Sequence, residues 1–254
     1  MTDETGAKLS QEELFARQEE LFYRQEPLLP ELMPYLFPDR VLHHKLMVNI
    51  CVDPDRAAHI NAVYLAKKAS LAELETQIGD GFKHVFLHER PYRCKALLRI
   101  ANHLSPAQYW HLVGEVWTDS ENIRQHKADW KRIWSAPIPE KHECMGPEER
   151  AKLEKMASSF NVWRGVGYRG GVGLSWTTDY DKAVWFARRF DPDSPRVLHG
   201  RVKRRDVHAF FTDRKESEIF AWKVEVLKTE RLPSRGADAK ASPKTTEPLS
   251  VGEK

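Results

Sequence analysis

An arginine followed by a glycine inside an apolar stretch is the first feature of this sequence that could carry chemistry. Arg164 and Gly165 lie within the run 161–166, which has the composition of a strand. A charged side chain is rarely buried unless it is paired or holds an anion. The guanidinium therefore indicates either a surface salt bridge on an edge strand or a site for an anionic group.

Two hydroxyl residues at alternate positions form the second feature. Ser175 and Thr177 flank Trp176 in a short run that leads into Asp179. Because successive side chains of a strand point to opposite faces, both hydroxyls are expected on one face. The pattern fits a polar site on a strand, and it also fits ordinary strand-end residues followed by a helix cap.

Two carboxylates with the same spacing form the third feature. Glu216 and Glu218 flank Ser217, immediately before an apolar run. Alternation predicts both on one face, close enough that each disfavours the ionisation of the other. An apolar strand directly after them indicates the edge of a cleft. The alternative is a solvated acidic turn that follows residues 213–215.

Short runs rich in β-branched and aromatic residues predict the strands that would position these groups. These runs are 161–166, 172–178, 196–203, 207–211 and 217–227. One helix is expected between them, with Asp179 as its N-cap. Its buried face would carry Ala183, Phe186, Ala187 and Phe190, which recur at helical spacing.

The preceding part of the chain is predicted to be helical. Ser10 begins one helix and Asp53-Pro54 another, which would end near Lys68 before a capping box at Ser70 starts a further short helix. Four tryptophans at helical spacing are expected to pack a core: Trp110, Trp117, Trp130 and Trp134.

The resulting map is an α+β chain with two domains. It has a helical domain at 10–145 and a mostly antiparallel β domain at 146–232, with residues 1–9 and 233–254 expected to be disordered.

Composition places the chain among globular proteins. Hydrophobic residues make up 41% and charged residues 30% of 254 residues, enough for a sizeable core. Forty Lys and Arg against 37 Asp and Glu give a net charge of +3, which does not indicate a nucleic-acid binder by charge alone.

The sequence predicts a cytoplasmic protein. It has three cysteines without a CxxC pair, no secretory signal and no apolar run long enough to cross a membrane. A protein exported without a cleaved signal has the same features.

In this order along the chain, the three features resemble the mono-ADP-ribosyltransferase superfamily, in its arginine–serine–glutamate class. The resemblance covers about residues 158–230. It implies that the helical N-terminal domain is followed by a split antiparallel β-sandwich, whose cleft holds NAD as the co-substrate. It also implies transfer of ADP-ribose to a macromolecular acceptor, most simply a protein arginine, with release of nicotinamide. A nucleic-acid acceptor is a second option, and hydrolysis of NAD is an expected side activity.

The resemblance assigns the NAD-binding roles residue by residue. Arg164 would contact the phosphates or the nicotinamide ribose, because a guanidinium fork suits a diphosphate. Gly165 would bond the nicotinamide carboxamide through its main chain, its missing side chain letting the ligand approach. Ser175 would hold the catalytic glutamate and the ribose, with Thr177 supporting the same face. Trp176 would wall the nicotinamide pocket, as would Trp163, although both fit the core equally well.

The same resemblance makes Glu218 the catalytic carboxylate. Cleavage of the nicotinamide–ribose bond builds positive charge on the ribose, and a fixed carboxylate stabilises that charge by about 3–4 kcal/mol. Glu216 would orient or deprotonate a guanidinium acceptor, whose positive charge also keeps the second carboxylate ionised.

The remaining polar clusters are weaker candidates. No histidine or cysteine cluster has zinc-ligand spacing, neither His43-His44, the pair His84 and His88, nor 142–144, so no metal is predicted. The basic clusters 188–189 and 203–205 are solvated turns or receptors for an acidic substrate.

Two further functions remain open at this point. The chain would be a non-catalytic module that binds a protein or nucleic acid through its helical half, or an NAD glycohydrolase toxin without a macromolecular acceptor. In the enzymatic interpretation the helical domain would recognise the target or a partner.

Overall fold

The chain forms two compact units, Met1–Cys144 and Met145–Lys254. In this computed structural model the described residues are 10, 11, 16, 26–76, 80–121, 123–167, 170–212 and 216–234. Residues 1–9, nearly all of the tail expected at 233–254, and most of the helix expected after Ser10 lie outside the described residues.

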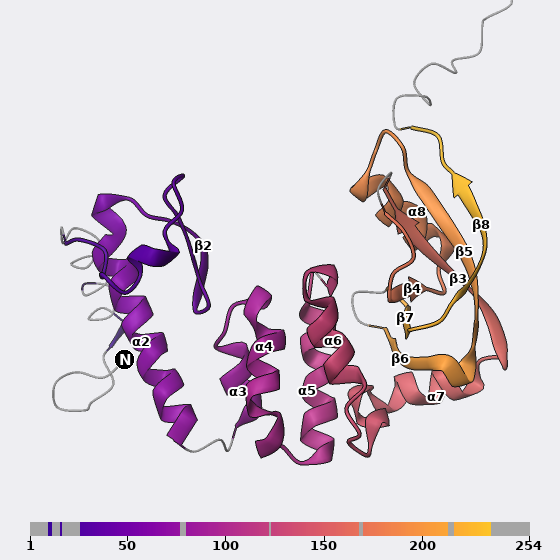
Figure 1. Cartoon of the computed structure of the whole chain (residues 1–254), viewed down its shortest axis with the longest axis horizontal. Helices are drawn as coiled ribbons and strands as arrows, with labels where there is room; N and C mark the ends of the chain where they lie inside the picture. The colour runs from indigo at the N-terminus through magenta and orange to yellow at the C-terminus, as the bar shows by residue number, and fades with distance from the viewer. Residues whose placement is uncertain are drawn as a thin grey trace, which may run out of the picture. The chain divides into compact units, whose positions relative to one another are not determined.

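The first unit contains a β-hairpin in addition to the expected helices (Figure 1). Its elements are η1 (Met33–Tyr35), β1 (Val41–His44), β2 (Met47–Cys51), η2 (Pro54–Arg56), α2 (Ala57–Thr76), α3 (Gly81–Phe86), α4 (Arg90–Ile100), η3 (Ala101–His103), α5 (Pro106–Asp119), η4 (Ile123–His126), α6 (Lys127–Trp134) and η5 (Lys141–Cys144). The expectation of an all-helical unit is therefore wrong at β1 and β2, which pair antiparallel. The hairpin buries Leu42 and Met47, which makes it part of the core of this unit.

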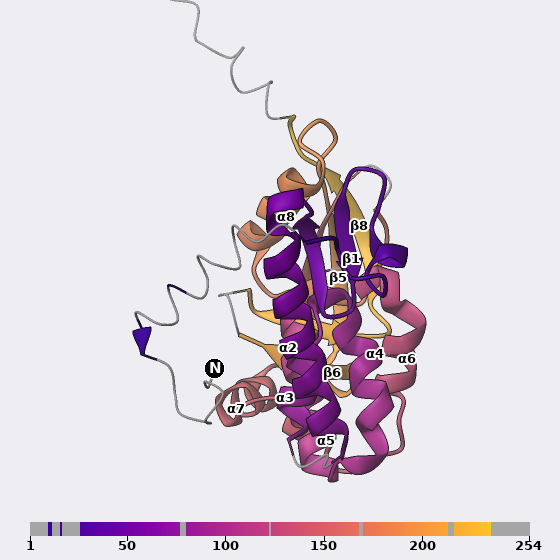
Figure 2. The same ribbon diagram turned by 90° about the vertical axis from the view of Figure 1, so that its left-hand side faces the viewer.

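The hairpin packs against α2, the longest described helix, as Figure 2 shows. Leu42, Leu46 and Met47 share a buried cluster with Ile60 and Tyr64 of that helix. The helix continues to Thr76, so the predicted break at Ser70 is wrong. Ser70 has capping chemistry, but it lies within the helix because the buried Leu71 extends the packed face.

The four tryptophans form the predicted core between α5 and α6. Trp110 and Trp130 are completely buried, and Trp117 and Trp134 are 1% exposed. Trp117 meets Trp130 and Trp134 edge to face, at ring-centroid distances of 5.0 and 5.6 Å, a geometry that aromatic pairs favour. The expectation of a helical aromatic core is confirmed.

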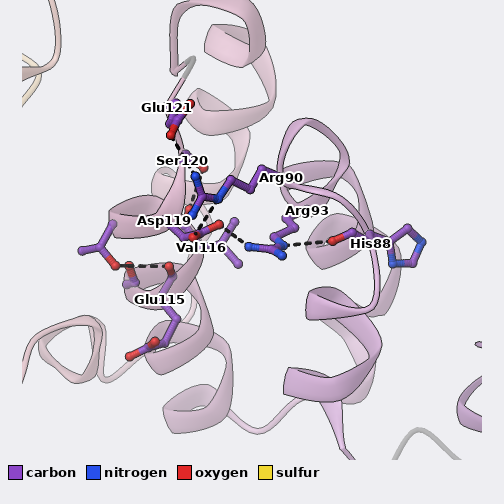
Figure 3. Close-up of polar contacts among 10 residues, drawn as sticks. His88, Arg90, Arg93, Glu115, Val116, Asp119, Ser120 and Glu121 are labelled. Carbon is purple, nitrogen blue, oxygen red and sulfur yellow. Dashed lines mark hydrogen bonds and ion pairs between the residues drawn. The ribbon is translucent and has the colours of Figure 1, made fainter. Parts of the chain in front are cut away.

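A charged cluster joins the end of α5 to the beginning of α4 (Figure 3). Asp119 accepts from Arg93, and its second oxygen lies 3.2 Å from Nε of Arg90. Arg93 also donates to the main-chain oxygen of His88 at 2.9 Å, while Arg90 reaches Glu121 at 2.8 Å. The arginines offset the unfavourable position of a carboxylate at a helix C-terminus, so this cluster has a structural explanation.

In its described residues, the second unit is a six-stranded antiparallel sheet with two α-helices. Its elements are α7 (Pro147–Lys155), β3 (Ser159–Val166), β4 (Ser175–Thr177), α8 (Tyr180–Phe190), β5 (Arg196–Lys203), η6 (Arg204–Asp206), β6 (Val207–Phe211), β7 (Glu218–Ala221) and β8 (Glu225–Arg231). The strand order is β6-β7-β4-β3-β5-β8. Helices and antiparallel sheets together confirm the α+β class.

One predicted strand is two strands that lie far apart in the sheet. The run 217–227 contains both β7, which pairs with β4 and β6, and β8, which pairs with β5 at the sheet edge. Residues 222–224 leave the sheet between them. No glycine or proline marks this break, so the expectation of one continuous strand is wrong for lack of a local signal.

Helix α8 lies against β3 and β5 (Figure 1). Two alanines of the helix make this contact. Asp179 caps it by accepting from the main-chain N–H of Lys182 at 3.1 Å, as expected. Ala183 and Ala187 are completely buried beside Val197. Phe190 is 60% exposed, so its assignment to the buried face is wrong: it is the last residue of the helix and lies beyond that contact.

Three buried histidines in the first unit, His44, His84 and His88, make its stability dependent on pH. His88 is 2% exposed, and its Nδ1 lies 2.9 Å from the main-chain oxygen of His84. Among the described residues, Nε2 of His88 has no hydrogen-bond partner. Burial lowers the pKa of His88 from 6.5 to about 4, and it also lowers the pKa of His84. His88 is therefore neutral in the folded chain at pH 7.

We predict that acid destabilises the first unit through His88. Between pH 6.5 and pH 4 the unfolded chain binds a proton at this position that the folded chain does not, so stability falls as the pH drops through this range. In His88→Asn, which keeps an N–H donor near Nδ1, the loss of unfolding free energy between pH 7 and pH 5 should be about 1.5 kcal/mol smaller than in the parent. Urea unfolding at both pH values measures this. His142→Asn, at a side chain that is 60% exposed, is the control, and an equal loss in parent and His88→Asn contradicts the prediction.

Candidate functional site

The residues expected to carry chemistry lie on three neighbouring strands of the second unit. Arg164 is on β3, Ser175 and Thr177 are on β4, and Glu218 is the first residue of β7. In register, Thr177 lies opposite Trp163 on one side and opposite Glu218 on the other. Strand pairing therefore brings these positions together from segments that are far apart in the sequence.

The hydroxyl of Thr177 holds in place the chain segment that leads into Glu218. Thr177 is 6% exposed. Its Oγ1 donates to the main-chain oxygen of Glu216 at 2.6 Å and accepts from the N–H of Asp179 at 3.0 Å. The main-chain N–H of Thr178 also donates to the oxygen of Ser217 at 3.1 Å. The turn before β7 is thus attached to the start of α8, and both hydrogen-bonding functions of the hydroxyl serve that attachment.

Strand alternation does not apply to Glu216 and Glu218, so the expectation that they share a face is left without its basis. Strand β7 begins only at Glu218, and Ser217 has a φ of 45°. A left-handed conformation at a residue other than glycine is uncommon and costs free energy. Glu216 therefore belongs to a turn rather than to the strand, and the direction of its side chain does not follow from a period of two.

Arg164 contacts Ser175 where β3 and β4 separate. The two strands share a single register pair, Trp163 with Thr177, so the carbonyl of Ser175 is not used in a ladder with β3. The guanidinium of Arg164 donates to that carbonyl. A Cβ on Gly173 would lie 2.4 Å from Cζ of Arg164, so this glycine makes room for the guanidinium.

By strand alternation, the side chains of Arg164 and Glu218 leave the main chain on opposite faces of the sheet. Trp163, Thr177 and Glu218 are aligned in register and share a face. Arg164 follows Trp163, so its Cβ points to the other face. Its half-buried side chain is brought back toward β4 by the contact with Ser175.

Gly165 is required by helix packing, which differs from the expected reason. A Cβ at this position would lie 2.2 Å from the oxygen of Ala183 and 2.4 Å from the nitrogen of Ala187. Real Cβ atoms do not approach main-chain atoms so closely. The missing side chain therefore lets α8 lie on β3, and this packing explains the glycine without a ligand.

The two tryptophans that were candidates for a pocket wall have different surroundings. Trp176 is 2% exposed, and its Nε1 donates to the oxygen of Gly173 at 3.0 Å, so it is a core residue and lines no open pocket. Trp163 is half-buried, and its Nε1 donates to Nδ1 of His199 at 3.2 Å.

Trp163 belongs to a hydrogen-bond network that sequence reasoning missed. Nε2 of His199 lies 2.6 Å from one carboxylate oxygen of Glu230, and the hydroxyl of Tyr180 donates to the other at 2.7 Å. These bonds, led by the one from Tyr180, lower the pKa of Glu230, and the same contact raises the pKa of Tyr180. The four residues come from β3, α8, β5 and β8, and no spacing in the sequence relates them.

One basic cluster has a structural role. Nη1 of Arg204 donates to the main-chain oxygens of Glu154 and Met156, the latter at 2.7 Å. These carbonyls lie at the C-terminal end of α7, where a cation is favourable. Within the described ranges, no group of three or more His, Cys, Asp or Glu side chains could hold a metal ion. None of the described helices combines the length and hydropathy that a membrane crossing requires.

Comparisons with models of protein families, with curated proteins and with solved structures found no match to this chain.

We predict that Gly165→Ala destabilises the second unit by about 3 kcal/mol, because the new methyl group meets the main chain of α8 and neither can move cheaply. Gly171→Ala is the matched control. Gly171 is exposed, a methyl group added there would have no atom within 4 Å, and its φ is outside the left-handed region. We expect Gly171→Ala to change stability by less than about 1 kcal/mol. Urea unfolding of the full chain measures both, and equal effects contradict the packing explanation.

Proposed function

We propose that the second unit is an ADP-ribosyltransferase domain, and that the chain transfers ADP-ribose from NAD to a macromolecular acceptor. The observation that carries the proposal is the order β7-β4-β3, in which Thr177 lies opposite Glu218 and Arg164 contacts Ser175. The resemblance to the arginine–serine–glutamate class requires these three side chains at one NAD cleft. The strands that carry them are adjacent, and although the Cβ of Arg164 points to the face opposite Glu218, its guanidinium turns to the carbonyl of Ser175 on β4. The simplest acceptor is a protein arginine.

Arg164 is the group that would hold the NAD diphosphate. A guanidinium carries five N–H donors in a planar fork, so a bond to the Ser175 carbonyl is compatible with a bidentate contact to a phosphate. That bond also fixes the position of the guanidinium before NAD arrives, which reduces the entropy lost on binding. The chemistry of the residues therefore fits the diphosphate of NAD.

Glu218 would act on the ribose. The bond between C1′ and the nicotinamide nitrogen breaks, and its electron pair leaves with neutral nicotinamide. The positive charge that develops on the ribose is stabilised by the carboxylate of Glu218, held by hydrogen bonds to a ribose hydroxyl and to the hydroxyl of Ser175. The attachment of the 216–218 turn to Thr177 and Thr178 supports this role, since a fixed carboxylate needs no reorganisation during the reaction.

Glu216 would receive the acceptor. An acceptor nitrogen attacks C1′ and forms the new C–N bond, and its proton passes to the carboxylate of Glu216. The left-handed Ser217 separates this carboxylate from the strand that carries Glu218. Strand alternation therefore does not tie the two glutamates to one face, which is compatible with one group that acts on NAD and another that acts on the acceptor.

We predict that Glu218→Gln lowers nicotinamide release from NAD by 100-fold or more, because the charge that stabilises the ribose cation is lost. Glu216→Gln should reduce transfer to protein while nicotinamide release to water continues. Biotinylated NAD incubated with a cell lysate measures transfer, and chromatography of released nicotinamide measures cleavage.

Glu225→Gln is the control for these two variants. Glu225 is an exposed glutamate on β8, and its replacement should leave both activities within twofold of the parent. If the folded parent chain neither labels a protein nor releases nicotinamide, or if Glu218→Gln is as active as the parent, the proposed function is wrong.

A further inference from the structure

A pocket of about 240 Å³ lies on the second unit, away from the carbonyl contact of Arg164. It is lined by Asn161, Trp163, His199, Gly200, Arg201, Leu227 and Lys228. These residues come from β3, β5 and β8, and Trp163, His199 and Lys228 are aligned in register across the three strands. They therefore share a face of the sheet.

The wall of the pocket is aromatic, and its ring nitrogens are already engaged. Trp163 donates to Nδ1 of His199, and Nε2 of His199 bonds to Glu230. An indole nitrogen can only donate, so His199 accepts at Nδ1 and donates from Nε2, which makes it a neutral ring. Tyr180 completes the network by donating to the second oxygen of Glu230. The two rings are therefore held rigidly and offer the ligand apolar surface rather than hydrogen bonds.

The polar groups of the pocket are cationic or neutral. Arg201 and Lys228 are exposed, and no ion pair involves either of them among the described residues. No acidic side chain lines the pocket. Glu225 lies opposite Arg201 in register without forming an ion pair. The carboxylate of Glu230 bonds to Tyr180 and His199 outside the pocket lining and also attracts Lys228 electrostatically. With a neutral His199, the pocket lining carries two positive charges.

We propose that this pocket binds a nucleoside monophosphate, with the base against Trp163 and the phosphate between Arg201 and Lys228. An aromatic wall beside two cations complements a ligand that joins a flat ring to an anion. The volume of about 240 Å³ is below the range of about 300–1,000 Å³ that is usual for drug-sized ligands, which favours one nucleotide over a dinucleotide. The amide of Asn161 supplies a donor and an acceptor for the base edge.

This site goes beyond the proposed transferase function. Arg164, Ser175 and Glu218, which would act on NAD, are not among the residues that line this pocket. The two sites therefore involve different cations, and each can be removed without the other.

Equilibrium binding of AMP to the full-length chain tests the proposal. We expect AMP to bind, and Arg201→Ala and Lys228→Ala each to weaken binding by fivefold or more. Lys203→Ala is the matched control, because Lys203 is also exposed on β5, two residues beyond Arg201, but does not line the pocket; it should change binding by less than twofold. All three replaced side chains are exposed, so the variants should fold.

Three further ligands and one variant complete the test. Adenosine and inorganic phosphate should each bind at least fivefold more weakly than AMP, because each lacks one half of the ligand.

An adenine oligonucleotide distinguishes a free nucleotide from a nucleic-acid strand. If it competes at a lower nucleotide concentration than AMP, the site serves a nucleic-acid strand, which overturns the assignment to a free nucleotide. Weaker competition supports the assignment. The proposal is also overturned if AMP does not bind at millimolar concentration, or if adenosine or phosphate binds as well as AMP. It is equally overturned if Arg164→Lys abolishes AMP binding while Arg201→Ala and Lys228→Ala leave it unchanged, since binding then belongs to the proposed NAD site.

Discussion

The hydroxyl of Thr177 is the interaction on which the candidate site depends. It bonds simultaneously to the segment before β7 and to Asp179, the N-cap of α8, from a position in register with both Trp163 and Glu218. A net contribution of about 1 kcal/mol for each such bond is small beside the stability of a domain. Its importance lies in geometry, because it holds in place a turn that contains the strained Ser217.

Two glycines complete this arrangement by making room for larger groups. Gly165 lets the main chain of α8 rest on β3, and Gly173 leaves space for the guanidinium of Arg164. Because β3 and β4 pair at only one position, that guanidinium can reach the carbonyl of Ser175. Pairing therefore keeps β3, β4 and β7 in order within one sheet. The single register pair between β3 and β4 leaves room for the guanidinium of Arg164 beside Ser175.

The parts of this fold that depend on local chemistry could be predicted from the sequence. The cap at Asp179, the strand 196–203 and the tryptophan core between α5 and α6 follow from side-chain type and spacing, and all are present. The hairpin β1–β2 and the division of the run 217–227 could not be predicted, because they depend on which segments pack against them. Alternation also failed at Glu216, since it assumes a regular strand and Ser217 interrupts the backbone.

In the candidate site, too, the sequence indicates the residue types but not which strands lie side by side. The types of Arg164, Ser175 and Glu218 could be selected from the sequence, but their proximity follows from register, which only the folded sheet defines. The network of Trp163, His199, Glu230 and Tyr180 joins four separate elements, so neither spacing nor composition indicated it.

The most direct test of the central claim is a crystal structure of the Glu218→Gln variant with NAD bound, since this variant should leave NAD uncleaved. The account predicts the diphosphate on the guanidinium of Arg164 and the nicotinamide ribose within hydrogen-bond distance of residue 218. NAD bound elsewhere on the second unit, with both residues more than a hydrogen-bond distance away, would contradict it.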